Sequence, residues 1–214
     1  ALKVDRRSML LYAVTDRAWT GTLSLKEQIE QALKGGVTCV QLREKELSLT
    51  EFAKEAAEIQ ALCRRYNTPF LINDNVELAV ACNADGVHVG QSDMAAGAVR
   101  KKIGREKILG VSVQTLQQAI AAQQQGADYL GVGAVFTTAT KLDADFVSLT
   151  TLQEICRTVT IPVVAIGGIN RSNLLQLSET GIEGVALVSA IFASTNITQE
   201  CGELLGLVKQ AVGK

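Results

Sequence analysis

The chain repeats one pattern about eight times: a short apolar segment, a cluster of small or polar residues directly after it, and a stretch with helical periodicity. The apolar segments cover residues 9–14, 37–42, 69–72, 85–89, 108–113, 128–132, 162–166 and 183–188. Strands that alternate with helices form a parallel sheet, and eight such units close a barrel. The repeat therefore predicts an α/β chain that folds as a single (β/α)8 TIM barrel.

Helices are expected in the gaps between these strands. Ser24 and Glu27 form a capping-box pattern at the start of the first helix, and Gly35 and Gly36 follow its end. The periodicity predicts further helices over about residues 50–66, 77–82, 94–103, 115–125, 148–158, 170–179 and 198–212. No linker interrupts the repeat, so residues 1–214 are expected to form one catalytic domain. The longest irregular stretch, residues 136–147, is a candidate lid.

Composition argues against several classes of function. The formal net charge is −1, which gives no overall field that would attract nucleic acid. No run of about 20 apolar residues is present, so a membrane span is not expected. The five cysteines include no C-x-x-C pair, which disfavours structural zinc and favours reduced thiols in the cytoplasm. We therefore expect a cytoplasmic protein with small-molecule substrates, and leave open whether it forms a homo-oligomer.

Polar residues alternate where the second strand ends. Side chains on a strand point to opposite faces in turn, so Gln41, Arg43 and Lys45 would share one face. Helices cover the outside of a barrel, and this polar face should point into its mouth. Two converging cations favour an anion such as phosphate. The alternative is a surface turn in which Glu44 and Glu46 pair with the cations.

Acidic residues follow the third and fourth strands, which are neighbours. Asp74 stands after Asn73, and Asp93 follows two residues after Gln91. Magnesium prefers one or two carboxylates together with waters and substrate phosphate oxygens. The pattern predicts a Mg²⁺ site at Asp74 and Asp93. The alternative is that either aspartate caps the helix that follows it.

A second anion site is expected on the other side of the barrel. Gly167 and Gly168 follow the seventh strand, and Val188 and Ser189 end the eighth. Paired glycines let the backbone approach a ligand closely, and N–H groups at a helix start bind anions. Phosphates often occupy this position in such barrels. Hydroxyls and an ammonium in the loop after the sixth strand could also bind phosphate; they belong to Thr138, Thr140 and Lys141.

His88 is the only histidine, and it lies inside the fourth strand. With no second histidine, a histidine metal site or a Ser–His relay has little support. We interpret His88 as a barrel-interior residue held by hydrogen bonds. Tyr12 and Trp19 could belong to the core or flank an aromatic substrate. Because no strong nucleophile or base stands out, the pattern favours a dissociative transfer in which metal and cations stabilise a leaving pyrophosphate.

The order and spacing of these motifs resemble the thiamine phosphate synthase family along nearly the whole chain. The matching segments are YAVTDR (12–17), QLREK (41–45), IND (72–74), ADGVHVGQ (84–91) with Asp93, GVS (110–112), TATK (138–141), AIGGI (165–169) and VSAI (188–191). The resemblance implies a Mg²⁺-assisted condensation of hydroxymethylpyrimidine diphosphate with thiazole phosphate, which gives thiamine phosphate and pyrophosphate. In that reaction the pyrimidine ionises first, and the thiazole nitrogen captures the carbocation.

The resemblance also implies a role for individual residues. Asp74 and Asp93 would hold magnesium, and Ser112 would lie at the reacting centre. The pyrophosphate would be bound by Gln41, Arg43, Lys45, Asn73 and Lys141. Arg43, Ser112 and Lys141 are the expected catalytic residues. The thiazole phosphate would be bound by Thr138, Thr140, Gly168, Val188 and Ser189.

The chain departs from the family pattern in one loop. Ala134 and Thr137 stand where the family usually has prolines, which predicts a looser lid. Two alternatives remain. The related thiazole tautomerases share the barrel but lose parts of the pyrophosphate and metal set and use a histidine base. A non-catalytic barrel could bind a phosphorylated precursor without turnover.

Overall fold

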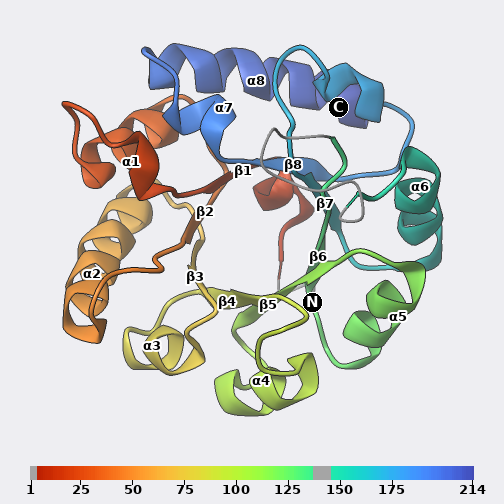
Figure 1. The fold of residues 1–214 in the computed structure, drawn as a ribbon, viewed down its shortest axis with the longest axis horizontal. Coiled ribbons are helices and arrows are strands. Elements are labelled where there is room, and N and C mark those ends of the chain that lie inside the picture. The colour runs from red at the N-terminus through yellow and green to blue at the C-terminus, as the bar shows by residue number, and fades with distance from the viewer. Residues whose placement is uncertain (1–3, 137–145) are drawn as a thin grey trace.

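Eight parallel strands pair in chain order and close into a barrel, with β1 beside β8. The structure, a computed structural model, describes residues 4–136 and 146–214. The strands are β1 (Leu11–Val14), β2 (Cys39–Leu42), β3 (Phe70–Asn73), β4 (Gly86–Val89), β5 (Ile108–Val113), β6 (Tyr129–Val132), β7 (Val163–Ile166) and β8 (Gly184–Leu187). Figure 1 shows the helices arranged around the outside of these strands. The predicted (β/α)8 barrel is confirmed.

Most of the predicted helices form within one or two residues of the expected bounds. They are α1 (Leu25–Lys34), α2 (Leu49–Arg65), α3 (Val76–Ala81), α4 (Ala96–Ile103), α5 (Leu116–Gln124), α6 (Leu149–Thr158) and α8 (Ile197–Val212). The capping box at Ser24 and Glu27 is present, and α2 begins with a second one at Ser48 and Glu51. Short 3-10 helices precede β1 (η1, Arg6–Met9) and follow it (η2, Arg17–Trp19).

The predicted helix over residues 170–179 is wrong. Only a 3-10 helix, η4 (Leu174–Leu177), forms there. The Asn173 side chain accepts a hydrogen bond from the Asn170 N–H, and the Asn170 side chain accepts one from the Ser172 N–H. These local bonds compete with α-helix formation, and Glu179 leaves the helical region at φ +65°. A short helix that was not predicted, α7 (Ser189–Phe192), follows β8 instead.

Side chains of the strands form two separate apolar layers. Val40, Leu42 and their counterparts on the other strands pack outward against the helices. Tyr12 and Tyr129 fill the barrel interior with smaller aliphatic residues. Alternation along each strand therefore directs one set of residues toward the helices and the other toward the barrel axis. The interior layer forms the floor beneath the mouth of the barrel.

Candidate active site

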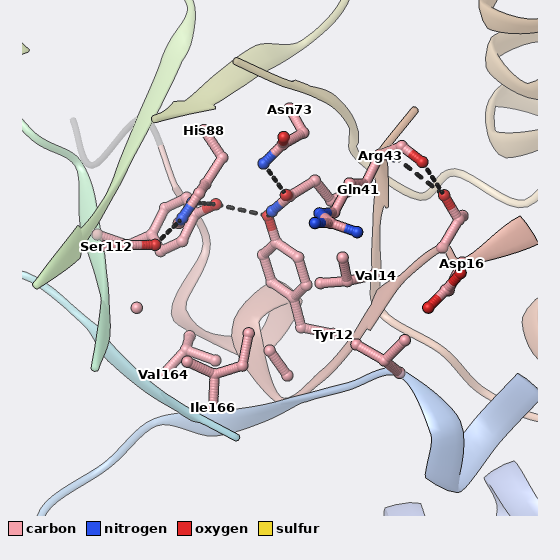
Figure 2. A pocket seen from close by; sticks show the side chains of 15 residues that line it. Tyr12, Val14, Asp16, Gln41, Arg43, Asn73, His88, Ser112, Val164 and Ile166 are labelled. Carbon is pink, nitrogen blue, oxygen red and sulfur yellow. Dashed lines mark hydrogen bonds between the residues drawn. The ribbon is translucent and has the colours of Figure 1, made fainter. Parts of the chain in front are cut away.

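A cavity of about 290 Å³ opens at the carboxyl ends of the strands (Figure 2). All eight strands contribute to its wall, so the cavity is the mouth of the barrel. The strand residues that line it are Tyr12, Val14, Gln41, Asn73, His88, Ser112, Tyr129, Gly131, Val164, Ile166 and Ala186. Polar groups gather on the β2 to β5 side, whereas Val164, Ile166 and Val188 form an apolar wall opposite.

A chain of hydrogen bonds crosses the floor of this cavity. The Asn73 Nδ2 donates to Gln41 Oε1 at 2.8 Å, and Gln41 Nε2 donates to the Tyr12 hydroxyl at 2.8 Å. The Tyr12 and Tyr129 hydroxyls lie 2.5 Å apart, and the Tyr129 hydroxyl is 2.8 Å from His88 Nδ1. His88 Nε2 lies 2.7 Å from Ser112 Oγ. Six strands, β1 to β6, are connected through their inward-facing side chains.

His88 is a hydrogen-bonded interior residue, as predicted. Burial lowers the pKa of its imidazole to about 4, although the Asp93 carboxylate acts in the opposite direction. The imidazole is therefore neutral near pH 7. Its contact with Ser112 is a Ser–His pair that the sequence argument disfavoured, and it lacks the carboxylate partner that a catalytic triad places on the histidine.

The two aromatic residues that the sequence left open behave differently. Tyr12 is 1% exposed and belongs to the barrel interior, whereas Trp19 on η2 is 42% exposed. Tyr129, which the sequence argument did not single out, is paired with Tyr12 in the cavity floor. Gly110 makes room for this ring, because a Cβ atom there would lie 2.2 Å from Tyr129 Cζ. In the sequence, the one indication of this role was that alternation along β6 directs Tyr129 toward the barrel interior.

The cationic residues after β2 flank the cavity. Gln41 points inward and is buried, whereas Val40 and Leu42 point outward, as the alternation predicted. Arg43 lines the cavity and its backbone N–H donates to Thr15 Oγ1 at 3.0 Å. Lys45 Nζ donates to Asn73 Oδ1 at 3.3 Å. Across residues 4–136 and 146–214, Arg43 and Lys45 form no ion pair, so the alternative of a salt-bridged surface turn is wrong.

Glu44 is held by a different partner. Arg17 on η2 pairs with Glu44 at 3.0 Å and also with Glu55 on α2. Burial, followed by the neighbouring Glu44 carboxylate, raises the pKa of Glu55 to about 7. This cluster connects the loop that carries Arg43 to two other elements. Its members are far apart in sequence, and the sequence argument did not identify it.

Asp74 and Asp93 come together beside the cationic residues. Burial raises the pKa of Asp74, and the Asp93 carboxyl adds to the effect through hydrogen bonding and like charge. Neither residue caps a helix: Asn75 caps α3, and α4 begins without a side-chain cap. The alternative capping roles are therefore wrong. Asp93 Oδ2 accepts a hydrogen bond from the Gly90 N–H at 2.7 Å, which fixes its turn.

These carboxylates have the donor chemistry that magnesium requires. The Asp93 carboxyl lies close enough to Asp74 to raise its pKa, and a divalent cation between the two side chains would relieve that repulsion. In the part of the chain that the structure describes, no three His, Cys, Asp or Glu side chains cluster as a larger metal site. The pair suits an ion that takes its remaining ligands from water and substrate.

The predicted second anion site is only partly described. Gly167 and Gly168 adopt φ of +101° and +66°, and a Cβ atom on Gly168 would lie 2.7 Å from the Phe136 carbonyl oxygen. The expectation of an α-helix start after β7 is wrong, since only the 3-10 helix η4 lies between β7 and β8, and the next α-helix along the chain begins at Ser189. Val188 lines the cavity and Ser189 is exposed. Thr138, Thr140 and Lys141 lie outside the described residues.

A closed barrel with a polar cavity at the strand carboxyl ends is the architecture of a (β/α)8-barrel enzyme. The family model described as thiamine monophosphate synthase matches residues 11–191. A thiamine-phosphate synthase of Ruminiclostridium cellulolyticum is 52% identical over 195 residues, which cover 91% of this chain and 93% of the relative. A thiamine-phosphate synthase of Clostridium tetani is 49% identical over 200 residues, which cover 94% of this chain and 96% of the relative.

A solved structure agrees with these relatives. The thiamine phosphate pyrophosphorylase from Pyrococcus furiosus superposes with a TM-score of 0.89 at 36% identity, and the match covers 97% of this chain and 99% of that one. The chain belongs to the thiamine monophosphate synthase family.

Two findings concern parts of the chain outside this site. The five cysteines are free thiols, so no disulfide joins them. Among residues 4–136 and 146–214, no helix combines the length and the apolar character that a membrane crossing needs.

Proposed function

We propose that this chain condenses 4-amino-2-methyl-5-hydroxymethylpyrimidine diphosphate with 4-methyl-5-(2-phosphoethyl)thiazole, giving thiamine phosphate and pyrophosphate. Membership of the family makes the protein a transferase of thiamine biosynthesis. The observation that carries the assignment to this reaction is the closeness of Asp74 to Asp93 and to Lys45, which itself donates to Asn73. A carboxylate pair for a divalent ion and an adjoining cation are the groups that a diphosphate needs.

The diphosphate would bind at the β2 and β3 ends of the cavity. Arg43 and Lys45 donate to its oxygens, and Gln41 and Asn73 supply neutral hydrogen bonds. Lys141 completes the set by family resemblance. Arg43 has no acidic partner among the described residues, so its guanidinium remains available for a substrate anion.

Asp74 and Asp93 would hold Mg²⁺. When bound, the ion supplies positive charge to the diphosphate oxygens as they become the leaving group. The protein's own part is to hold both carboxylates in place. Asp93 is fixed by the Gly90 N–H, and Asp74 by its backbone N–H, which donates to the His88 carbonyl oxygen at 2.8 Å.

The reaction needs no protein nucleophile or base. The bond between the pyrimidine methylene carbon and the diphosphate oxygen breaks, and both electrons leave with the diphosphate. The thiazole nitrogen then donates its lone pair to that carbon and becomes the cationic nitrogen of thiamine phosphate. No proton is removed, which agrees with a neutral His88 in the cavity. Ser112 would contact the reacting centre, and Arg43 and Lys141 would stabilise the leaving charge.

The thiazole phosphate would bind on the opposite side of the mouth. Val164 and Ile166 offer an apolar wall to the ring. The phosphate would approach the glycine turn after β7, where Gly167 and Gly168 both adopt positive φ. The residues assigned to this phosphate are Thr138, Thr140, Gly168, Val188 and Ser189.

An assay with both phosphorylated precursors tests the proposal. Purified protein should release pyrophosphate and form thiamine phosphate in equal amounts, and only with Mg²⁺. Isomerisation of a thiazole carboxylate without pyrophosphate release would instead indicate the tautomerase alternative. Tight binding of either precursor without product would indicate a non-catalytic barrel.

The free cysteines support the proposed cytoplasmic location, and residues 1–214 are proposed to act as one domain.

A further inference from the structure

The hydrogen bonds in the cavity floor form one continuous chain whose direction matters. It runs from Lys45 through Asn73, Gln41, Tyr12, Tyr129 and His88 to Ser112, and most of it can be followed in Figure 2. Amides, phenols and imidazole can each donate or accept at the linking atoms. The chain can therefore be satisfied with all hydrogens pointing toward Ser112 or all pointing toward Lys45.

Lys45 breaks this symmetry. An ammonium has donors and no acceptor, so the Asn73 atom that faces it must be the carbonyl oxygen. The Asn73 amide nitrogen then faces Gln41 and donates to its oxygen. As a result, the Gln41 amide nitrogen donates to the Tyr12 hydroxyl.

The direction passes through the two tyrosines to the histidine. The Tyr12 hydroxyl oxygen already accepts a hydrogen bond from Gln41. The Tyr12 hydroxyl hydrogen therefore points to the Tyr129 hydroxyl oxygen, which lies 2.5 Å away and accepts it. Tyr12 and Tyr129 are each 1% exposed, so water cannot replace that acceptor. The Tyr129 hydrogen therefore points to His88 Nδ1, and the imidazole carries its only ring N–H on Nε2.

We propose that Lys45 sets the direction of this chain, and that Tyr12, Tyr129 and His88 are positioning residues that keep the Ser112 hydroxyl as a hydrogen-bond donor to the substrate. His88 Nε2–H donates to Ser112 Oγ, so the serine hydrogen is free to point into the cavity. The opposite direction would make Ser112 donate to His88 and offer only lone pairs to a ligand. This inference rests on the proposed function, because it adds positioning residues around Ser112.

The barrel is shaped to admit these groups. A Cβ atom on Gly110 would overlap the Tyr129 ring, and one on Gly131 would lie 3.3 Å from His88 Cε1. Glycines thus stand beside the rings of Tyr129 and His88, which lie at the centre of the hydrogen-bonded chain. The register pairs His88 with Gly110 and Ser112 with Gly131, which brings the inward side chains of β4, β5 and β6 together.

Nuclear magnetic resonance of the substrate-free protein tests the direction. His88 is the only histidine, so ¹⁵N-histidine labelling gives one ring whose two nitrogens can be assigned. Near pH 7.5, the wild-type ring should be protonated at Nε2 and unprotonated at Nδ1. In Lys45→Met, the tautomer ratio should shift toward Nδ1–H by roughly tenfold, the worth of one hydrogen bond to a charged group. Lys101→Met, an exposed lysine on α4, is the matched control and should leave the ratio unchanged.

Two outcomes would overturn the proposal: a wild-type ring protonated at Nδ1, or a ratio that Lys45→Met does not change. Tyr129→Phe provides a second test, since it removes one oxygen and keeps the ring. It should shift the same ratio and lower kcat about tenfold, with KM for both precursors within about twofold. An unchanged kcat in an active protein would refute the positioning role. Absence of synthase activity with the expected tautomer would instead refute the proposed function alone.

Discussion

Acidification should destabilise the fold through His88. Burial lowers the pKa of its imidazole from 6.5 to about 4, so between these values the unfolded chain binds a proton that the folded protein does not. The free energy of unfolding therefore rises with pH across this window. The contribution is fully present above pH 6.5 and is lost as the pH falls toward 4. Its size is about 3 kcal/mol, because each tenfold change in proton affinity corresponds to about 1.4 kcal/mol.

Urea denaturation between pH 4 and pH 8 measures this effect. The wild-type protein should lose about 3 kcal/mol more unfolding free energy between pH 7 and pH 4 than His88→Gln does. The difference between the two proteins removes the contribution of other acidic groups. Because the chain has a single histidine, its ring titration can also be followed directly. A ring pKa near 6.5, or an equal loss of stability in both proteins, would show that burial does not lower the pKa of His88.

Substitutions at three further positions test the site and its support. Asp93→Asn keeps an acceptor for the Gly90 N–H but should weaken divalent-ion binding at least about 100-fold, since a unit charge about 4 Å away contributes about 4 kcal/mol. Asp93→Ala should abolish Mg²⁺-dependent condensation and lower the free energy of unfolding by only about 1 kcal/mol. A parental rate in either variant would contradict the metal assignment. Arg43→Ala should raise KM for the pyrimidine diphosphate far more than for the thiazole phosphate, and equal changes would reject the two-site division. Glu55→Gln should gain stability relative to wild type in urea as the pH rises from about 4.5 to about 7, because the raised pKa of Glu55 means that the wild-type contribution is lost over that interval. A difference that stays constant with pH would contradict this.

The barrel and the orientation of its strands could be predicted from the sequence. Alternation with period two was sufficient to place Gln41 inward and Val40 and Leu42 outward. Strand order was sufficient to bring Asp74 and Asp93 together, because neighbouring parallel strands end at the same edge. The prediction of a helix over residues 170–179 failed because asparagine side chains there accept hydrogen bonds from the backbone. These bonds compete with the α-helix, and the spacing of apolar residues does not reveal them.

The chain of hydrogen bonds in the cavity floor could not be predicted from the sequence. Tyr12 and Tyr129 lie 117 positions apart, and each stands in an apolar strand where a core aromatic is the ordinary expectation. Their contact depends on the register of strands on opposite sides of a closed barrel. The cluster of Arg17, Glu44 and Glu55 has the same origin, since three separate elements supply its members.

Divalent-ion binding in the presence of inorganic pyrophosphate tests whether Asp74 and Asp93 hold the metal. Mn²⁺ can replace Mg²⁺ and can be followed by its electron paramagnetic resonance. We predict one tightly bound Mn²⁺ per chain with pyrophosphate, and loss of that ion in Asp74→Asn and in Asp93→Asn. If both variants bind Mn²⁺ and pyrophosphate as tightly as the wild-type protein, these aspartates do not hold the metal and the proposed mechanism is contradicted.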